Sequence, residues 1–133
     1  MLFDIEPDGP VPIYEQIVAQ VIYGVAAGTL GPGLTIPSVR ELAERLVVNP
    51  NTVARAFQEL ERAGIVTPRR GLGMEVTAEA PGLCRARRQE IVRERIRAAL
   101  REAASSALTP DQIRKIVDEE LSRVNGKRPR EKP

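Results

Sequence analysis

The chain has 133 residues, which is room for one domain or a small domain with an appendage and too few for a large multidomain enzyme. It contains no histidine and one cysteine, Cys84, which excludes His-based catalytic triads, His metal sites and zinc clusters and makes an enzyme the least supported hypothesis. The net charge of +2 conceals two unlike parts, because residues 1–80 carry six basic and ten acidic side chains whereas residues 81–133 carry fourteen and eight.

The composition also bears on the compartment in which the protein works. No segment approaches the roughly twenty apolar residues of a membrane span, and the start MLFDIEPDGP is acidic where a signal peptide is basic. The unpaired Cys84 fits a reducing compartment and is expected to be a small buried hydrophobe. We therefore expect a cytoplasmic protein with no membrane contact, no metal and no cofactor.

The first 36 residues are expected to form an irregular arm, a helix and a short strand. Residues 1–12 contain three prolines and a glycine, which predicts an irregular N-terminal arm. From Ile13 to Ala27 apolar residues, Tyr14 among them, recur at intervals of three and four, the pattern of a helix with one buried face. The segment Gly28 to Gly33 breaks this helix, and Leu34 to Ile36 is a short β-prone stretch.

Two short helices follow, separated by a tight turn. Ser38 and Glu41 are predicted to form a capping box, in which the Ser38 hydroxyl accepts from the amide of Glu41 and the Glu41 carboxylate reaches back to the amide of Ser38. Asn49 before Pro50 predicts the start of the second helix, since Asn suits the N-cap and Pro the first helical position. That helix is expected to run to Gly64, a residue type suited to the left-handed position after a helix.

The remaining chain is predicted to form a hairpin and two long helices. Two β-rich runs, Ile65–Thr67 and Glu75–Thr77, flank a basic tip, and pairing with residues 34–36 would make a three-stranded sheet. Residues 79–82 are expected to be a linker. Residues 83–125 are expected to form a helical tail with apolar stripes, and residues 126–133 a disordered basic tail.

Together these elements predict a mainly α fold with a small β-hairpin, in which a winged helix-turn-helix domain over residues 13–78 precedes a two-helix α-hairpin. At 100° per residue, the second short helix places Asn51, Thr52 and Arg55 opposite its apolar face. A helix fits the major groove of DNA, its first amides suit phosphate, and Asn and Arg side chains match the edges of adenine and guanine. Double-stranded DNA is therefore the expected partner.

Five segments closely resemble, in order, the GntR family of bacterial transcription regulators: 36–43 (IPSVRELA), 48–53 (VNPNTV), 56–60 (AFQEL), 64–65 (GI) and 69–73 (RRGLG). The resemblance covers about residues 11–78 of the chain, and the VNPNTV segment and the tail of two helices are similar to the short-tailed YtrA-like branch. It implies a homodimeric repressor that binds a palindromic operator, often of a transporter operon, and it leaves room for an unidentified small-molecule effector.

The chain departs from the family pattern at a few positions. Ile36 stands where many relatives have Leu, and Val47 stands where a glycine often lies in the turn. If Val47 needs a positive φ, the backbone strain is about 1–3 kcal/mol. Many family members outside this branch have Arg at the positions of Pro50 and Ala54, so base contacts known from them do not transfer to these two positions.

The candidate DNA-binding residues lie on the two short helices and on the hairpin tip, and they are Ser38, Arg40, Asn49, Asn51, Thr52, Arg55, Arg69, Arg70 and Gly71. Asn51 and Arg55 are the candidates for base edges and Thr52 for a phosphate. Ser38 and Asn49 are helix caps on any interpretation, and a solvated side chain beside Glu44 is the alternative for Arg40. The three tip residues suit a wing that follows the minor groove, with an ordinary polar hairpin tip as the alternative.

The helical tail carries the predicted dimerisation residues, which are Val92, Ile96, Leu100, Ile113, Ile116, Val117 and Leu121. A hairpin of two helices leaves one side of each apolar stripe exposed, and pairing with a second copy would form a four-helix arrangement. The alternative is a tail packed on the winged domain. For the whole protein, the rival hypothesis is a winged-helix protein-interaction module without specific DNA binding.

Overall fold

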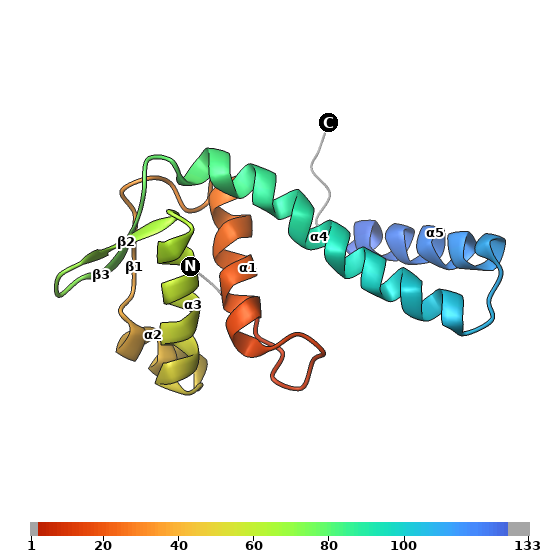
Figure 1. Ribbon diagram of the computed structural model, residues 1–133, viewed down its shortest axis with the longest axis horizontal. Helices are drawn as coiled ribbons and strands as arrows, with labels where there is room; N and C mark the ends of the chain where they lie inside the picture. Colours follow the sequence, from red (N-terminus) through yellow and green to blue (C-terminus); the bar gives the residue numbers. More distant parts are fainter. Residues whose placement is uncertain (1–2, 128–133) are drawn as a thin grey trace. The chain divides into compact units, whose positions relative to one another are not determined.

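The computed structural model describes residues 3–127 and divides the chain into two compact units, residues 1–91 and 92–133 (Figure 1). The fold is mainly α with one small sheet, which confirms the predicted class. The elements in chain order are α1 (Ile13–Ala26), β1 (Thr35–Ile36), α2 (Val39–Leu46), α3 (Pro50–Arg62), β2 (Val66–Arg69), β3 (Gly73–Val76), α4 (Ala80–Ser105) and α5 (Pro110–Lys127).

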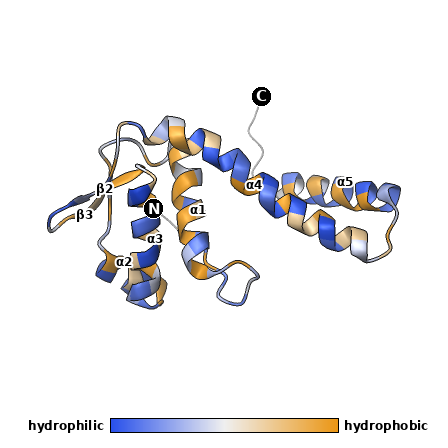
Figure 2. Ribbon diagram, viewed as in Figure 1, coloured by the Kyte–Doolittle hydropathy of each residue, from blue (hydrophilic) through white to orange (hydrophobic). Residues whose placement is uncertain are grey.

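The core of the first unit is built on the aliphatic faces of α1 and α3, which pack against each other. On α1, Ile17, Val21 and Val25 recur every four residues and are at most 2 % exposed, as the sequence periodicity predicts. On α3, Val53 and Leu60 are at most 1 % exposed. Burial of each such side chain contributes roughly 1.5–3 kcal/mol, so the two helices form a stable base for the elements around them. Figure 2 shows α1 hydrophobic over most of its length.

The N-terminal arm is held on α1 by two glutamine side chains. The Gln20 amide donates to the carbonyl of Asp4 (2.7 Å) and accepts from its N–H (2.8 Å). Gln16 makes the same pair of hydrogen bonds with Glu6, at 2.9 and 2.8 Å. Residues 3–12 form neither helix nor strand, and these side chains satisfy backbone groups that would otherwise need a strand partner.

The helices α2 and α3 end in the same hydrogen-bonded motif, although different residue types occupy its left-handed position. After α3, Gly64 has φ +83° and Ile65 donates its N–H to the carbonyl of Leu60 (3.0 Å), which confirms the predicted glycine C-cap. After α2, Val47 has φ 55° and ψ 52°, and Val48 donates to the carbonyl of Ala43 (3.1 Å). The turn after α2 therefore has the left-handed backbone that glycine favours, but the residue in it is valine. A β-branched residue with positive φ is strained.

The three strands form an antiparallel sheet in the order β1-β3-β2. Thr35 and Thr67 both pair with Glu75 from opposite sides of β3, so β1 joins the hairpin as predicted. Gly73 opens β3 with φ +102°, and a Cβ at this position would overlap the carbonyl oxygen of Ile36. A glycine is therefore required where the hairpin crosses the end of β1.

The linker predicted over residues 79–82 is wrong, because α4 begins at Ala80. Pro81 is tolerated there, since the first amides of a helix have no intrahelical acceptor. Ala80, Cys84 and Ile91 are buried in the core of the first unit, so packing selects a helix over the loop that Pro and Gly favour locally. The first unit accordingly extends to Ile91.

The second unit contains the end of α4 and all of α5, joined by a short turn at residues 106–109 (Figure 1). The start of α5 is a capping box, with reciprocal hydrogen bonds between Thr109 and Gln112 at 2.9 and 3.1 Å. Gly126 and Lys127 belong to α5, which corrects the predicted start of the basic tail, and residues 128–133 lie outside the described residues. Within the part of the chain that the structure describes, no helix is long and apolar enough to cross a membrane.

Candidate nucleic-acid interface

The start of α2 is shaped by Ser38. Its Oγ accepts a hydrogen bond from the N–H of Glu41 at 3.2 Å, which is half of the predicted capping box. The other half is replaced, because the Glu41 carboxylate pairs with Arg45 one turn later at 2.7 Å. The other amides of this first turn have no helical partner, and such amides suit an anion.

The start of α3 is capped by Asn49. Its Oδ1 accepts from the N–H of Asn51 at 2.8 Å, and Pro50 takes the first helical position, as predicted. The Asn49 side chain is therefore engaged in the fold, and any contact that it makes with a ligand would add to this structural role. The cap fixes the direction in which α3 leaves the turn.

The outward face of α3 presents the polar side chains that the periodicity predicts. Asn51 and Arg55 are exposed and Thr52 is half-buried. Arg55 has a defined neighbour, because its guanidinium carbon lies 3.8 Å from the centroid of the Tyr14 ring and its Nη2 donates to the Tyr14 hydroxyl at 3.1 Å. The face thus combines a free amide with an arginine held on an aromatic ring from α1.

The sequence pattern places Tyr14 only in the apolar stripe of the first helix. The structure packs it partly against the core and turns its hydroxyl toward Arg55. The signal that could have revealed this role is the residue type, since a half-buried tyrosine in an aliphatic stripe needs a polar partner for its hydroxyl.

The wing tip carries Arg69, Arg70 and Gly71, all exposed. The Arg69 Nε lies 2.9 Å from the Glu75 carboxylate on the neighbouring strand, so this arginine braces the hairpin. Gly71 has φ +75°, which suits the tight turn between β2 and β3. Of the two tip arginines, Arg70 is the one without a carboxylate within 4.0 Å among the described residues.

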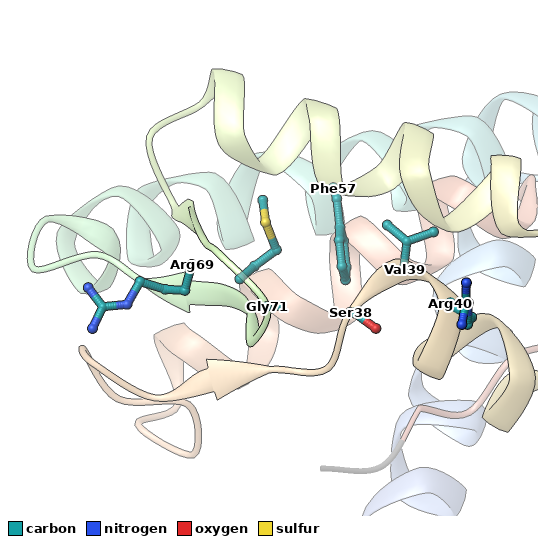
Figure 3. Close-up of a pocket in the computed structure, with 8 residues that line it drawn as sticks. Ser38, Val39, Arg40, Phe57, Arg69 and Gly71 are labelled. Atoms are coloured by element: carbon teal, nitrogen blue, oxygen red, sulfur yellow. The ribbon is translucent and has the colours of Figure 1, made fainter.

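A groove of about 450 Å³ lies between the start of α2 and the wing, and it brings several predicted residues together. Ser38, Arg40, Arg69 and Gly71 line it. Figure 3 shows Ser38, Val39 and Phe57 gathered at the α2 end, with the Arg69 side chain extending away along the wing. The groove therefore has an apolar floor with basic groups and a helix start along its edges.

The arginines of this surface differ in their pairing. Among the residues that the structure describes, Arg40, Arg55 and Arg70 have no carboxylate within 4.0 Å, whereas Arg45 and Arg69 do. Arg40 is exposed and is not ion-paired with Glu44, so its DNA contact stays a prediction beside the alternative of a solvated side chain. Cations that are not neutralised within the chain remain available to an anionic partner such as a phosphate backbone.

The predicted dimerisation residues lie on α4 and α5 of the second unit. Ile113 is half-buried, and the other six are 41–57 % exposed; they are Val92, Ile96, Leu100, Ile116, Val117 and Leu121. Large apolar side chains so exposed along two helices form a surface that is typical of protein association.

Cys84 is fully buried, and burial raises the pKa of its thiol to about 11. The thiol is therefore uncharged and a poor nucleophile at neutral pH.

Known proteins share both the sequence and the architecture. Residues 13–76 match the family model of bacterial regulatory proteins of the gntR family. The HTH-type transcriptional repressor YtrA of Bacillus subtilis (strain 168) is 32 % identical over 94 % of this chain and 96 % of its own length.

Solved structures extend the likeness. The crystal structure of a transcriptional antiterminator from Listeria monocytogenes EGD-e aligns with a TM-score of 0.65 at 31 % identity, covering 99 % of this chain and 98 % of that chain. YtrA from Sulfolobus acidocaldarius, a GntR-family transcription factor, aligns with a TM-score of 0.56 at 33 % identity over 75 % of this chain and 98 % of that chain. The chain belongs to the GntR family of DNA-binding transcription regulators, in its short-tailed YtrA-like branch.

Proposed function

We propose that this protein is a cytoplasmic, homodimeric repressor that binds a palindromic operator controlling a transporter-type operon. The observation that carries the proposal is the outward face of α3, which presents Asn51 and Arg55 without a carboxylate partner among the described residues. The B. subtilis relative is named a repressor, which supports the direction of control.

In this proposal α3 enters the major groove. Arg55 donates to the O6 and N7 atoms of a guanine, and Asn51 bonds the N6 and N7 atoms of an adenine. Thr52 and the capped starts of the two short helices face the phosphates, which fix the position of the protein without reading sequence. Ser38, Arg40 and Asn49 are the side chains at those starts.

The wing is proposed to follow the adjacent minor groove. Arg70 approaches its negative potential as a free cation. Arg69 reaches the backbone only by exchanging its ion pair with Glu75, so we assign it the smaller share. Gly71 lets the tip come close to the sugar-phosphate backbone, since it has no side chain.

Dimerisation is proposed to occur through the second unit. The exposed apolar side chains of α4 and α5 would be buried by a second copy in a four-helix arrangement. Two-fold symmetry then presents two α3 helices to half-sites about 34–36 Å apart, one turn of DNA. A small-molecule effector would act by changing this dimer geometry.

The test is selection from random-sequence DNA. Full-length protein is incubated with a library of random duplexes, the bound fraction is sequenced, and the mass in solution is measured by sedimentation at micromolar concentration. We expect one two-fold symmetric motif, a dimer, and an affinity that falls steeply with salt as phosphate contacts release counterions. A monomer, or a bound pool with no enriched motif, would favour the protein-interaction module instead.

A further inference from the structure

Among the described residues, Arg55 is the arginine of the candidate interface that rests on an aromatic ring. Tyr14 lies 41 positions earlier in the sequence and contributes both its ring face, 3.8 Å from the guanidinium carbon, and its hydroxyl, 3.1 Å from Nη2. The ring is partly buried against the core of the first unit. It is therefore a fixed platform beneath a side chain that is otherwise exposed.

Arg55 contacts the Tyr14 ring although two glutamates lie close to this pair in the sequence. Glu15 follows Tyr14 and accepts a long hydrogen bond from its hydroxyl at 3.4 Å, and Glu59 lies one turn after Arg55 on α3. The Arg55 guanidinium nevertheless has no carboxylate within 4.0 Å among the described residues, in contrast to Arg45 on Glu41 and Arg69 on Glu75.

A ring and a carboxylate hold an arginine with different consequences. A carboxylate neutralises the cation and adds a negative charge that repels a phosphate backbone. An aromatic face attracts the cation without cancelling its charge. The hydroxyl uses one of the five N–H donors of the guanidinium, so four remain for a ligand.

We propose that Tyr14 is a positioning residue for sequence recognition, which holds Arg55 in the orientation that reads a base edge. The proposal rests on the proposed function. Its physical basis is preorganisation, because an arginine already fixed in one rotamer loses less conformational entropy when it binds. Lysine cannot take the same role, since a single ammonium has neither the flat face nor the donor fork.

The test compares Tyr14→Leu, Tyr14→Phe, Arg55→Ala and the double variant Tyr14→Leu with Arg55→Ala. The probe is the duplex that the parent protein enriches from a random-sequence library, together with copies of it that differ at single base pairs. Tyr23→Leu is the matched control, because Tyr23 is the other tyrosine of α1 and is also half-buried. Thermal unfolding of each variant verifies that the winged domain is folded.

We expect Tyr14→Leu to weaken binding of the enriched duplex by roughly two- to tenfold, the range expected for one long side chain that must be ordered on binding. Tyr14→Leu should also lose discrimination at one base pair, the same base pair at which Arg55→Ala loses it. Tyr14→Phe, which keeps the ring, should retain most of the affinity, and Tyr23→Leu all of it. In the Arg55→Ala background, Tyr14→Leu should have no further effect.

Other results would overturn the inference. Unchanged binding by Tyr14→Leu would show that Arg55 needs no platform, and tighter binding would show that Tyr14 withholds Arg55 from DNA. An equal loss in the Arg55→Ala background would assign Tyr14 a contact or a structural role of its own. If the parent enriches no sequence, both this inference and the proposed function fail, whereas an enriched motif that depends on Arg55 but not on Tyr14 defeats this inference alone.

Discussion

The two units of the chain use apolar residues in opposite ways. Leu60 on α3 is 1 % exposed, whereas Leu100 on α4 is 41 % exposed, although both are leucines on regular helices. The first unit surrounds its apolar residues with α1, α2, α3, the start of α4 and the sheet. Among the described residues of the second unit, the apolar stripes of α4 and α5 stay exposed. The first unit thus buries its apolar residues within one chain, whereas the second leaves large apolar side chains exposed, the surface that we propose a second copy covers.

The largest effect is expected from placing a charge on that surface. Ile96→Glu should convert the proposed dimer to a monomer, because a carboxylate buried between apolar helices loses its hydration without a partner. Loss of the second recognition helix removes the avidity of two linked half-sites, so affinity for the enriched duplex should fall by roughly 10²- to 10⁴-fold. Sedimentation and operator titration at micromolar protein measure the two effects.

A variant of equal charge isolates the position. Ala98→Glu adds the same carboxylate about 200° further around α4, away from the stripe, and should leave the dimer and its affinity intact. If Ile96→Glu remained a dimer, the association surface would lie elsewhere and the contrast between the two units would lose its functional meaning.

The next largest effect is expected when a leucine is replaced by alanine in the first unit, and the same replacement in the second unit is its comparison. Leu60→Ala should lower the free energy of unfolding of the first unit by about 2–5 kcal/mol, because it leaves a cavity in a packed core. Leu100→Ala should change that quantity by less than about 0.5 kcal/mol and should instead weaken the dimer. Both tyrosines lie on α1 and the chain has no tryptophan, so tyrosine fluorescence during urea unfolding reports the first unit. Equal losses from both variants would mean that the two units form one cooperative core.

Features that depend on local signals could be predicted from the sequence. Ser38, Asn49 and Gly64 mark helix ends through contacts within a few residues, and each lies at the predicted end. The three-stranded sheet followed from β-rich runs and the turn residues between them. The segments and residue types of the candidate interface were predictable for the same reason.

Features that depend on distant neighbours could not be predicted in this way. Pro81 and Gly82 favour a linker locally, but burial of Cys84 in the core extends α4 back through them. The contact of Tyr14 with Arg55 joins two helices, and periodicity in one helix carries no information about the residue that faces it from another. Which arginines are ion-paired is equally a tertiary property.

A smaller effect concerns the turn after α2, where Val47 is the non-glycine residue with positive φ among the described residues of the first unit. Val47 is 88 % exposed with φ 55°, so its replacement by glycine loses little burial. Val47→Gly relieves left-handed strain of roughly 1–2 kcal/mol and adds unfolded-chain entropy worth about 0.4–1 kcal/mol. The unfolding free energy should therefore rise by about 1 kcal/mol or less in urea titrations.

The reverse substitution at the equivalent position after α3, Gly64→Ala, is the control for Val47→Gly. Gly64→Ala places a Cβ at an ordinary 3.7 Å from Leu83, so its cost is confined to the left-handed backbone and should lower stability by about 1 kcal/mol. A loss of stability in Val47→Gly would mean that the valine side chain contributes more to the turn than its exposure indicates.

The smallest effect on the free energy of unfolding is expected from Cys84, which packs the start of α4 against the core of the first unit. This effect is absent near neutral pH and develops above pH 9. Its thiol pKa is raised by burial from 9.0 to about 11, so between these values the folded state binds more protons than the unfolded state. The free energy of unfolding should then fall as the pH rises from 9 toward 11. Below pH 9 the thiol is protonated in both states and adds no pH dependence. Cys84→Ala removes the thiol and should show a shallower fall over the same range, so the difference between the two urea titrations isolates it from the other groups that titrate there. Identical slopes would place the thiol in contact with water, and the first unit would then end before Cys84 rather than at Ile91.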